Sequence, residues 1–216
     1  MMGAIHQSWM EHLEYSKKVN KHACIIAPWG HGKSTQLVIG RTLWEVGRNP
    51  NIRIKIVCNS DENARSRVSA ISGYISEDAD FRSVFPDIKP AVREQWTQHR
   101  FFVQRTSRSI DPTVEAKGIL TTGTGGRCDG IIFDDPVDQR NAIDNPAMQP
   151  KIINNFKNVW LPRLEPKGWM LYIATRWTES DLTAVLLEDP ELANAYCVLI
   201  QRISEDYSKI DCERIG

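Results

Sequence analysis

Two small groups of polar residues carry side chains that could act together on a phosphate. Lys33 and Ser34 end a glycine-containing stretch, and Asp134 and Asp135 close an apolar run. An ammonium group neutralises phosphate oxygens, a hydroxyl ligates Mg²⁺, and a carboxylate polarises a water molecule for attack. Together these residue types predict hydrolysis of a nucleoside triphosphate with Mg²⁺.

The stretch Ala27–Thr35 has the surroundings of a phosphate-binding loop. It follows the apolar run Ala23–Ile26, which predicts a buried strand, and precedes residues 36–44, whose apolar spacing predicts a helix. Backbone N–H groups of such a loop surround the β-phosphate, and the helix N-terminus adds partial positive charge. Lys33 is expected to reach the β- and γ-phosphates, and Ser34 to ligate Mg²⁺. The residues predicted to bind the nucleotide here are Pro28, Trp29, Gly30, His31, Gly32, Lys33, Ser34 and Thr35.

One position departs from the G-x-x-x-x-G-K-S pattern of these loops, because Ala27 stands where the first glycine is expected. The alternative interpretation is an ordinary glycine-containing turn that leaves Lys33 on the surface. The strand before the loop and the helix after it favour phosphate binding.

The second group ends the apolar run of residues 129–136. We expect Asp134 to hold Mg²⁺ through water, and Asp135 to orient and polarise the attacking water. Acidic turns at strand ends are common, so the pair alone is a weak signal. Together with Lys33 it indicates an ATPase that uses ATP and Mg²⁺.

Gln7 is a further candidate for nucleotide binding, at the start of a helix predicted over residues 6–19. In many P-loop translocases a glutamine upstream of the loop contacts the adenine edge, because an amide both donates and accepts hydrogen bonds. The alternative is a solvated residue at a helix start.

Composition limits the class of protein. The 216 residues include 27 Lys and Arg and 27 Asp and Glu, so any attraction to nucleic acid must come from a local patch. The five cysteines are scattered without metal-ligand spacing, which predicts reduced thiols. No apolar run approaches the ~18 residues of a membrane span. These features predict a soluble intracellular protein without a membrane partner.

The remaining pattern predicts alternating strands and helices. We expect strands over residues 52–58, 100–105, 118–122, 129–134, 169–174 and 196–200, and helices over 62–75, 151–161 and 178–187, the last opened by a capping box at Thr178 and Asp181. Residues 81–90 are predicted to be a loop, and residues 202–216 show no period. The pattern predicts an α/β P-loop NTPase of the motor type (ASCE), in which helices sandwich a mainly parallel sheet and one strand separates the P-loop strand from the acid-bearing strand. Residues 1–202 are predicted to form the ATPase domain, and residues 203–216 a linker or tail.

Three motifs together resemble the N-terminal ATPase domain of the large terminase subunit of tailed bacteriophages. They are Ala27–Thr35, Gly126–Pro136 and Ala174–Leu182, in order and over most of the chain; the Thr-Arg-Trp of the third discriminates best. The resemblance implies that Asp134 is the Mg²⁺ acid and that Asp135 takes the catalytic-carboxylate role, where many relatives have Glu. It also implies that Thr175 belongs to a coupling motif that senses the γ-phosphate; the alternative is an ordinary β-branched residue at a strand end.

Two arginine positions matter for this resemblance. Related terminases place an arginine near the position of Arg127 that reaches a neighbouring subunit's nucleotide as an arginine finger, whereas the alternative is a solvated loop arginine. Many terminases also carry arginine in the loop where this chain has Trp29, which could stack on the base or on a neighbouring subunit. Without a cis arginine, we expect an isolated monomer to hydrolyse ATP poorly.

The resemblance implies a motor that drives double-stranded DNA into a viral procapsid in the host cell cytoplasm. Its implied partners are the DNA phosphate backbone, the portal protein, the small terminase subunit and further copies in a homo-oligomeric ring. The candidate DNA contacts, chosen by charge, are Arg100, Arg105, Arg108 and Lys157. The alternatives are a helicase-like nucleic-acid translocase and a nucleotide-dependent binding module without turnover. In the family a nuclease domain follows, for which residues after 202 are too few, so we expect a fragment without nuclease activity.

Overall fold

A computed structural model describes residues 3–92, 94–121, 125–203 and 210–215 of the chain. Its centre is one sheet with the strand order β3-β4-β2-β5-β6-β1-β7-β8. The strands are β1 (His22–Ile26), β2 (Ile54–Cys58), β3 (Arg100–Phe101), β4 (Val114–Gly118), β5 (Cys128–Asp134), β6 (Leu164–Ala174), β7 (Tyr196–Ile203) and β8 (Ile210–Ile215). The six inner strands are parallel, and β3 and β8 pair antiparallel at the two edges.

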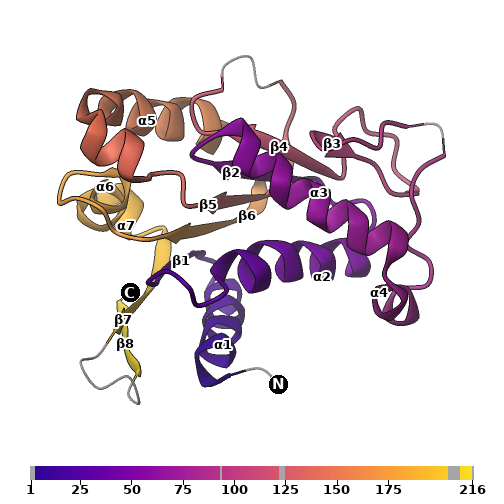
Figure 1. Cartoon of the computed structure of the whole chain (residues 1–216), viewed down its shortest axis with the longest axis horizontal. Helices are drawn as coiled ribbons and strands as arrows, with labels where there is room; N and C mark the ends of the chain where they lie inside the picture. Colours follow the sequence, from indigo (N-terminus) through magenta and orange to yellow (C-terminus); the bar gives the residue numbers. More distant parts are fainter. Residues whose placement is uncertain (1–2, 93, 122–124, 204–209, 216) are drawn as a thin grey trace.

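Helices cover both faces of this sheet (Figure 1). Packed on one face are α1 (Ala4–Lys18), α2 (Arg41–Arg48), α3 (Asp61–Glu77) and α4 (Ala79–Val84). The other face carries α5 (Gln149–Asn155), its continuation through Trp160, and α6 (Leu182–Glu188), beside the short α7 (Pro190–Ala193). The predicted α/β fold, a mainly parallel sheet between helices, is confirmed.

The inner strands are apolar on both sides, as expected of parallel strands covered by helices. Along β6, Leu171 and Ile173 enter one core while Met170 and Tyr172 enter the other, because successive side chains point to opposite faces. The chain therefore builds two cores on one sheet, and these fix the position of each strand end.

The predicted inserted strand is β6, which lies between β1 and β5. Its register pairs Ala174 with Ile26 of β1 and Ile173 with Asp134 of β5. Because these strands are parallel, their carboxyl ends reach the same edge of the sheet. The residues that follow β1, β5 and β6 consequently meet there.

Several element predictions were wrong in position. Residues 79–84 form α4 within the predicted loop, capped by Asp78, whose carboxylate accepts from the Phe81 N–H. The strand predicted over 118–122 is β4, which ends at Gly118 because its register follows β2. Of residues 100–105 only Arg100 and Phe101 belong to β3. The periodless tail contains β8, whose backbone pairs with β7.

The capping box predicted at Thr178 is also wrong, because the cap of α6 is Asp181 itself. Its side chain is fully buried and accepts from the Ala184 N–H at 3.0 Å. The same carboxylate accepts from the N–H groups of Trp177 and Thr178, both at 3.1 Å. One aspartate thus starts the helix and fixes the loop that follows β6.

None of the helices in the described ranges is long and apolar enough to cross a membrane.

Candidate active site

The loop after β1 has the backbone of a phosphate-binding loop. Gly30 and Gly32 have φ angles of 77° and 75°, which side-chain-bearing residues rarely adopt. Ala27 is not among the described residues with positive φ, so its methyl group is tolerated at the position of the first glycine. Gly30, His31 and Gly32 are exposed, so the loop opens to solvent.

Two histidine side chains donate hydrogen bonds to backbone carbonyl groups of this loop. The His6 ring on α1 donates through Nε2 to the His31 carbonyl oxygen at 2.9 Å. The His31 ring in turn donates through Nδ1 to the Trp29 carbonyl oxygen at 2.6 Å. The start of α1 therefore lies against the loop.

Lys33 is buried and lies at the meeting point of three strand ends. Its ammonium donates to the Ala27 carbonyl and to Thr175 Oγ1, both at 2.6 Å, and lies 3.8 Å from Asp135 Oδ1. Burial lowers the pKa of Lys33, opposed by the negative charges of Asp135 and Asp134. The ammonium is thus held among oxygen atoms from the ends of β1, β5 and β6.

Ser34 and Asp134 could hold a magnesium ion. The Ser34 hydroxyl donates to Asp134 Oδ1 at 3.2 Å, and Asp134 is 2% exposed. A hydroxyl and a carboxylate next to a phosphate-binding loop are hard oxygen ligands of the kind that Mg²⁺ takes, usually together with water and substrate phosphates. The donor set therefore fits Mg²⁺. The described residues contain no cluster of three or more His, Cys, Asp or Glu side chains that could hold a metal by itself.

Asp135 directly after β5 has a strained backbone. Its φ of 44° lies in the left-handed region, where aspartate is tolerated better than most residues. The Asp135 N–H donates to the Ile173 carbonyl at 2.9 Å, and Oδ1 accepts from the Thr175 N–H at 2.8 Å. Burial raises the pKa of Asp135, Lys33 lowers it, and Asp134 raises it further, with a net rise. Such strain and a raised pKa are typical of functional carboxylates.

Thr175 joins the lysine and the carboxylate. It contacts Lys33 through its hydroxyl and Asp135 through its N–H. Since Asp181 fixes the two residues after Arg176, the loop that follows Thr175 is held in place from behind.

Trp29 packs on the loop after β6. Its ring centroid lies 5.1 Å from that of Trp177, with an angle of 57° between the planes, and its side chain is 62% exposed. The contact links the phosphate-binding loop to the Thr-Arg-Trp segment, and stacking of Trp29 on a base or on a neighbouring subunit stays a prediction.

Sequence reasoning missed Arg67 on α3. Arg67 Nε donates to Asp134 Oδ2 at 2.9 Å, and Nη2 donates to Ser34 Oγ at 3.3 Å. The apolar periodicity of the helix placed Arg67 away from the buried stripe, and no motif marks it. Only the packing of α3 on β2, the neighbour of β5, and against the helical segment that begins at Ser34 reveals the contact.

Two predicted site residues lie apart from this cluster. Gln7 is exposed, and its amide donates to Glu11 at 3.3 Å, although its neighbour His6 contacts the loop. Arg127 precedes β5 and therefore lies at the opposite end of that strand from Asp134, roughly 23 Å along it. There its guanidinium is 3.5 Å from Glu165 and 57% exposed. Arg127 does not reach the phosphate-binding loop of its own chain.

The arginines and lysine proposed for DNA contact have different surroundings. Arg105 donates to the carbonyls of Ser109 and Asp111, both at 2.7 Å, and Lys157 pairs with Asp189 at 2.5 Å. Arg100 donates to Gln95 at 2.5 Å. Arg108 is exposed.

No family model matches the chain. The large terminase subunit of Enterobacteria phage T3 is 27% identical over 165 residues, which cover 76% of this chain. The resemblance to a phage large terminase subunit, predicted from the motifs, is confirmed.

The chain spans 27% of the length of that terminase. The solved structure of a Sulfolobus solfataricus SWI2/SNF2 ATPase core in complex with dsDNA is 14% identical, with a TM-score of 0.45 over 85% of this chain and 34% of its own.

Proposed function

We propose that this chain is the ATP-hydrolysing motor domain of a large terminase subunit, residues 1–202, which drives double-stranded DNA into a procapsid. The observation that carries the proposal is the convergence of Lys33, Asp135 and Thr175 at the carboxyl edge of three adjacent parallel strands. The similarity to the phage T3 large terminase subunit supports the packaging role.

Each group of residues in the site has its own role in the proposed ATP hydrolysis. The N–H groups around Gly30 and Gly32 would bind the phosphate chain, and Lys33 would neutralise its oxygens. Ser34 and Asp134 would hold Mg²⁺, which supplies charge neutralisation to the leaving phosphates.

Asp135 would accept a hydrogen bond from the attacking water and orient it. Because the Thr175 N–H donates to Asp135 and its hydroxyl accepts from Lys33, loss of the γ-phosphate would change both contacts of Thr175. Thr175 would pass that change to the loop that Asp181 holds, toward the parts that grip DNA.

The proposal includes partners beyond the chain. In the host cell cytoplasm, a ring of copies would surround double-stranded DNA at the portal, with the small terminase subunit recruiting the genome. Contacts to DNA phosphates would be salt-dependent.

The direct test is steady-state ATP hydrolysis with Mg²⁺ by wild type and Lys33→Ala. Lys18→Ala is the matched control, because Lys18 is exposed at the end of α1. We expect turnover in the wild type and the control and none above background in Lys33→Ala. Equal turnover in all three proteins would overturn the assignment of the site. Unwinding of a duplex without translocation along it would favour the helicase alternative. Tight ATP binding without turnover would favour the nucleotide-dependent binding module.

A further inference from the structure

The surroundings of Asp134 contain a positive charge that the mechanism above does not use. The carboxylate is buried, yet one of its oxygens accepts from Arg67 Nε at 2.9 Å. The same guanidinium donates through Nη2 to the Ser34 hydroxyl at 3.3 Å. Arg67 therefore contacts both residues that the proposed function assigns to Mg²⁺.

A guanidinium and a magnesium ion compete for these two residues. Both are cations, and they repel each other strongly at such short range in a partly buried site. The Ser34 oxygen that accepts from Arg67 is also the oxygen that would ligate the ion. Mg²⁺ bound to the Ser34 oxygen would therefore weaken the contacts of Arg67 with Ser34 and Asp134.

The backbone of Arg67 is fixed, whereas its side chain is partly exposed. The buried residues Ala64, Val68 and Ile71 anchor α3 on the sheet, whereas the Arg67 side chain remains 30% exposed. The guanidinium keeps its charge, because arginine stays protonated in proteins. A charged, long and half-exposed side chain at the edge of the phosphate-binding loop can turn toward phosphate oxygens.

We propose that Arg67 is an exchangeable cation of the site. It neutralises Asp134 until a Mg²⁺–nucleotide complex takes over Asp134 and Ser34, and it then contacts the phosphate chain from within the same subunit. The inference rests on the proposed nucleotide site.

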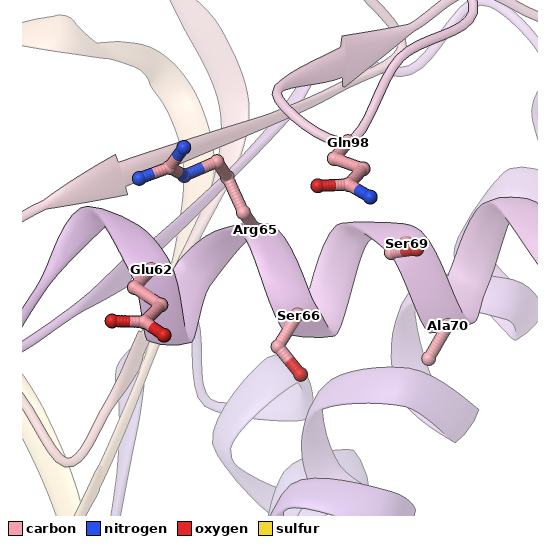
Figure 2. A pocket seen from close by; sticks show the side chains of 6 residues that line it. All are labelled: Glu62, Arg65, Ser66, Ser69, Ala70 and Gln98. Carbon is pink, nitrogen blue, oxygen red and sulfur yellow. The ribbon is translucent and has the colours of Figure 1, made fainter.

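The chain offers a matched control on the same helix. Figure 2 shows Arg65 with Glu62 and Ser66 on a part of α3 that borders a cavity of ≈ 740 Å³, to which Gln98 also contributes. Arg65 donates through Nε to the Asp61 carbonyl at 3.2 Å. Residues 27–35 do not line this cavity. Arg65→Gln thus removes the same charge from α3 without touching the proposed site.

The test is equilibrium binding of mant-ADP, with saturating Mg²⁺ and with EDTA, to wild type, Arg67→Gln, Arg67→Lys and Arg65→Gln. With EDTA, loss of Arg67 leaves the buried Asp134 carboxylate next to the phosphates without any cation, whereas with Mg²⁺ the ion still neutralises it. The loss should therefore weaken binding more in EDTA than in Mg²⁺. We expect the ratio of the dissociation constants in EDTA and in Mg²⁺ to rise about tenfold in Arg67→Gln, the loss of one charge-assisted hydrogen bond. Arg67→Lys should keep most of the wild-type ratio, and Arg65→Gln all of it.

Other outcomes distinguish failure of the Arg67 exchange from failure of the proposed nucleotide site. An unchanged ratio in a folded Arg67→Gln protein, with both constants as in the wild type or both weakened equally, would overturn the exchange. Thermal unfolding establishes whether each variant is folded. If Arg67→Gln does not fold, Arg67→Lys takes its place, because lysine keeps a positive charge beside Asp134. If the wild type binds mant-ADP no better than Lys33→Ala, the proposed function itself fails, whatever Arg67 does.

Discussion

At the scale of single residues, the candidate site depends on a few contacts between loops that follow different strands. Asp135 is held in a left-handed conformation, and Thr175 donates to it while accepting from Lys33. These contacts fix the direction of the carboxylate before any substrate binds. Asp135 is shorter than glutamate by one methylene group, so the backbone must bring it close to the nucleotide.

Replacing Asp135 tests whether it acts as the base. Asp135→Asn keeps the shape and the hydrogen bond from Thr175 but removes the negative charge. We expect ATP hydrolysis to fall by about 10²- to 10⁴-fold while ATP stays bound. Single-turnover hydrolysis and nucleotide retention measure this, with exposed Asp144→Asn as the control. A variant that hydrolyses ATP normally would remove Asp135 from the mechanism.

The raised pKa of Asp135 predicts the acidic limb of the hydrolysis rate. A base works only when unprotonated, so turnover should fall as the pH decreases through the pKa of Asp135, above the ordinary value of 3.8. The pH dependence of kcat/KM for ATP, which reports groups of the free protein, gives this midpoint. A midpoint at or below the ordinary value would show that the net effect of burial and Asp134 on Asp135 is small.

Trp29 and Trp177 should stabilise each other's loops. Aromatic pairs of this geometry contribute about 0.5–1.5 kcal/mol beyond area burial. A double-mutant cycle with Trp29→Ala and Trp177→Ala, followed by chemical unfolding, should return a coupling energy in that range. Additive effects of the two substitutions would mean that the contact does not couple the loops.

At the scale of elements, a buried ion pair ties β2 to β4. Lys55 stands opposite Glu115 in the register, and Nζ lies 2.5 Å from Oε2 with both residues buried. Lys117 adds a second contact to Glu115 at 3.1 Å. Burial raises the pKa of Glu115, but the two lysines outweigh it, so the pKa is lowered. This pair lies in the sheet and not at the site, so its loss should affect stability first.

Removing one partner of this pair should be costly. Lys55→Met leaves Glu115 buried with Lys117 alone, and we expect the free energy of unfolding to fall by roughly 3 kcal/mol. The double variant Lys55→Met, Glu115→Leu should recover most of this loss. Because the folded pKa of Glu115 is lowered, its stabilisation is present above pH 4.5, the ordinary value, and is lost as the pH falls through the folded pKa. Urea unfolding at several pH values checks both statements.

At the scale of the whole molecule, Arg127 and the phosphate-binding loop lie at opposite ends of the parallel strands. The guanidinium is exposed and its carboxylate partner is Glu165 at the start of β6. An arginine so placed cannot serve its own nucleotide, and a role in hydrolysis requires a second copy that turns this end toward the loop. A role of Arg127 in catalysis would therefore need a second copy of the chain, as a ring would supply.

Mixing variants tests this arrangement. Lys33→Ala and Arg127→Ala should each be inactive alone, and their mixture should recover activity because intact loop and intact arginine meet at some interfaces. Wild-type turnover per subunit should also rise with protein concentration. The double variant Lys33→Ala, Arg127→Ala mixed with either single variant shows how much recovery depends on both intact halves. Hydrolysis independent of concentration would exclude the trans arginine while leaving the ATPase intact.

The sequence by itself determined the parallel sheet and the phosphate-binding loop, because both are encoded locally. Apolar runs such as Ala23–Ile26 predict buried strands, and two glycines before Lys33 allow the positive φ angles that the loop needs. The motor-type topology expected of such a fold also placed one strand between the P-loop strand and the acid-bearing strand, and the structure identifies this strand as β6.

The tertiary structure alone decided the partners that come from distant elements. Arg67 reaches Asp134 only because α3 packs on β2, the strand next to β5, and Trp29 meets Trp177 only because β1 and β6 are neighbours. The position of Arg127 at the amino end of β5 likewise follows from the direction of that strand. Such contacts depend on how the elements pack against one another, which local residue patterns do not carry.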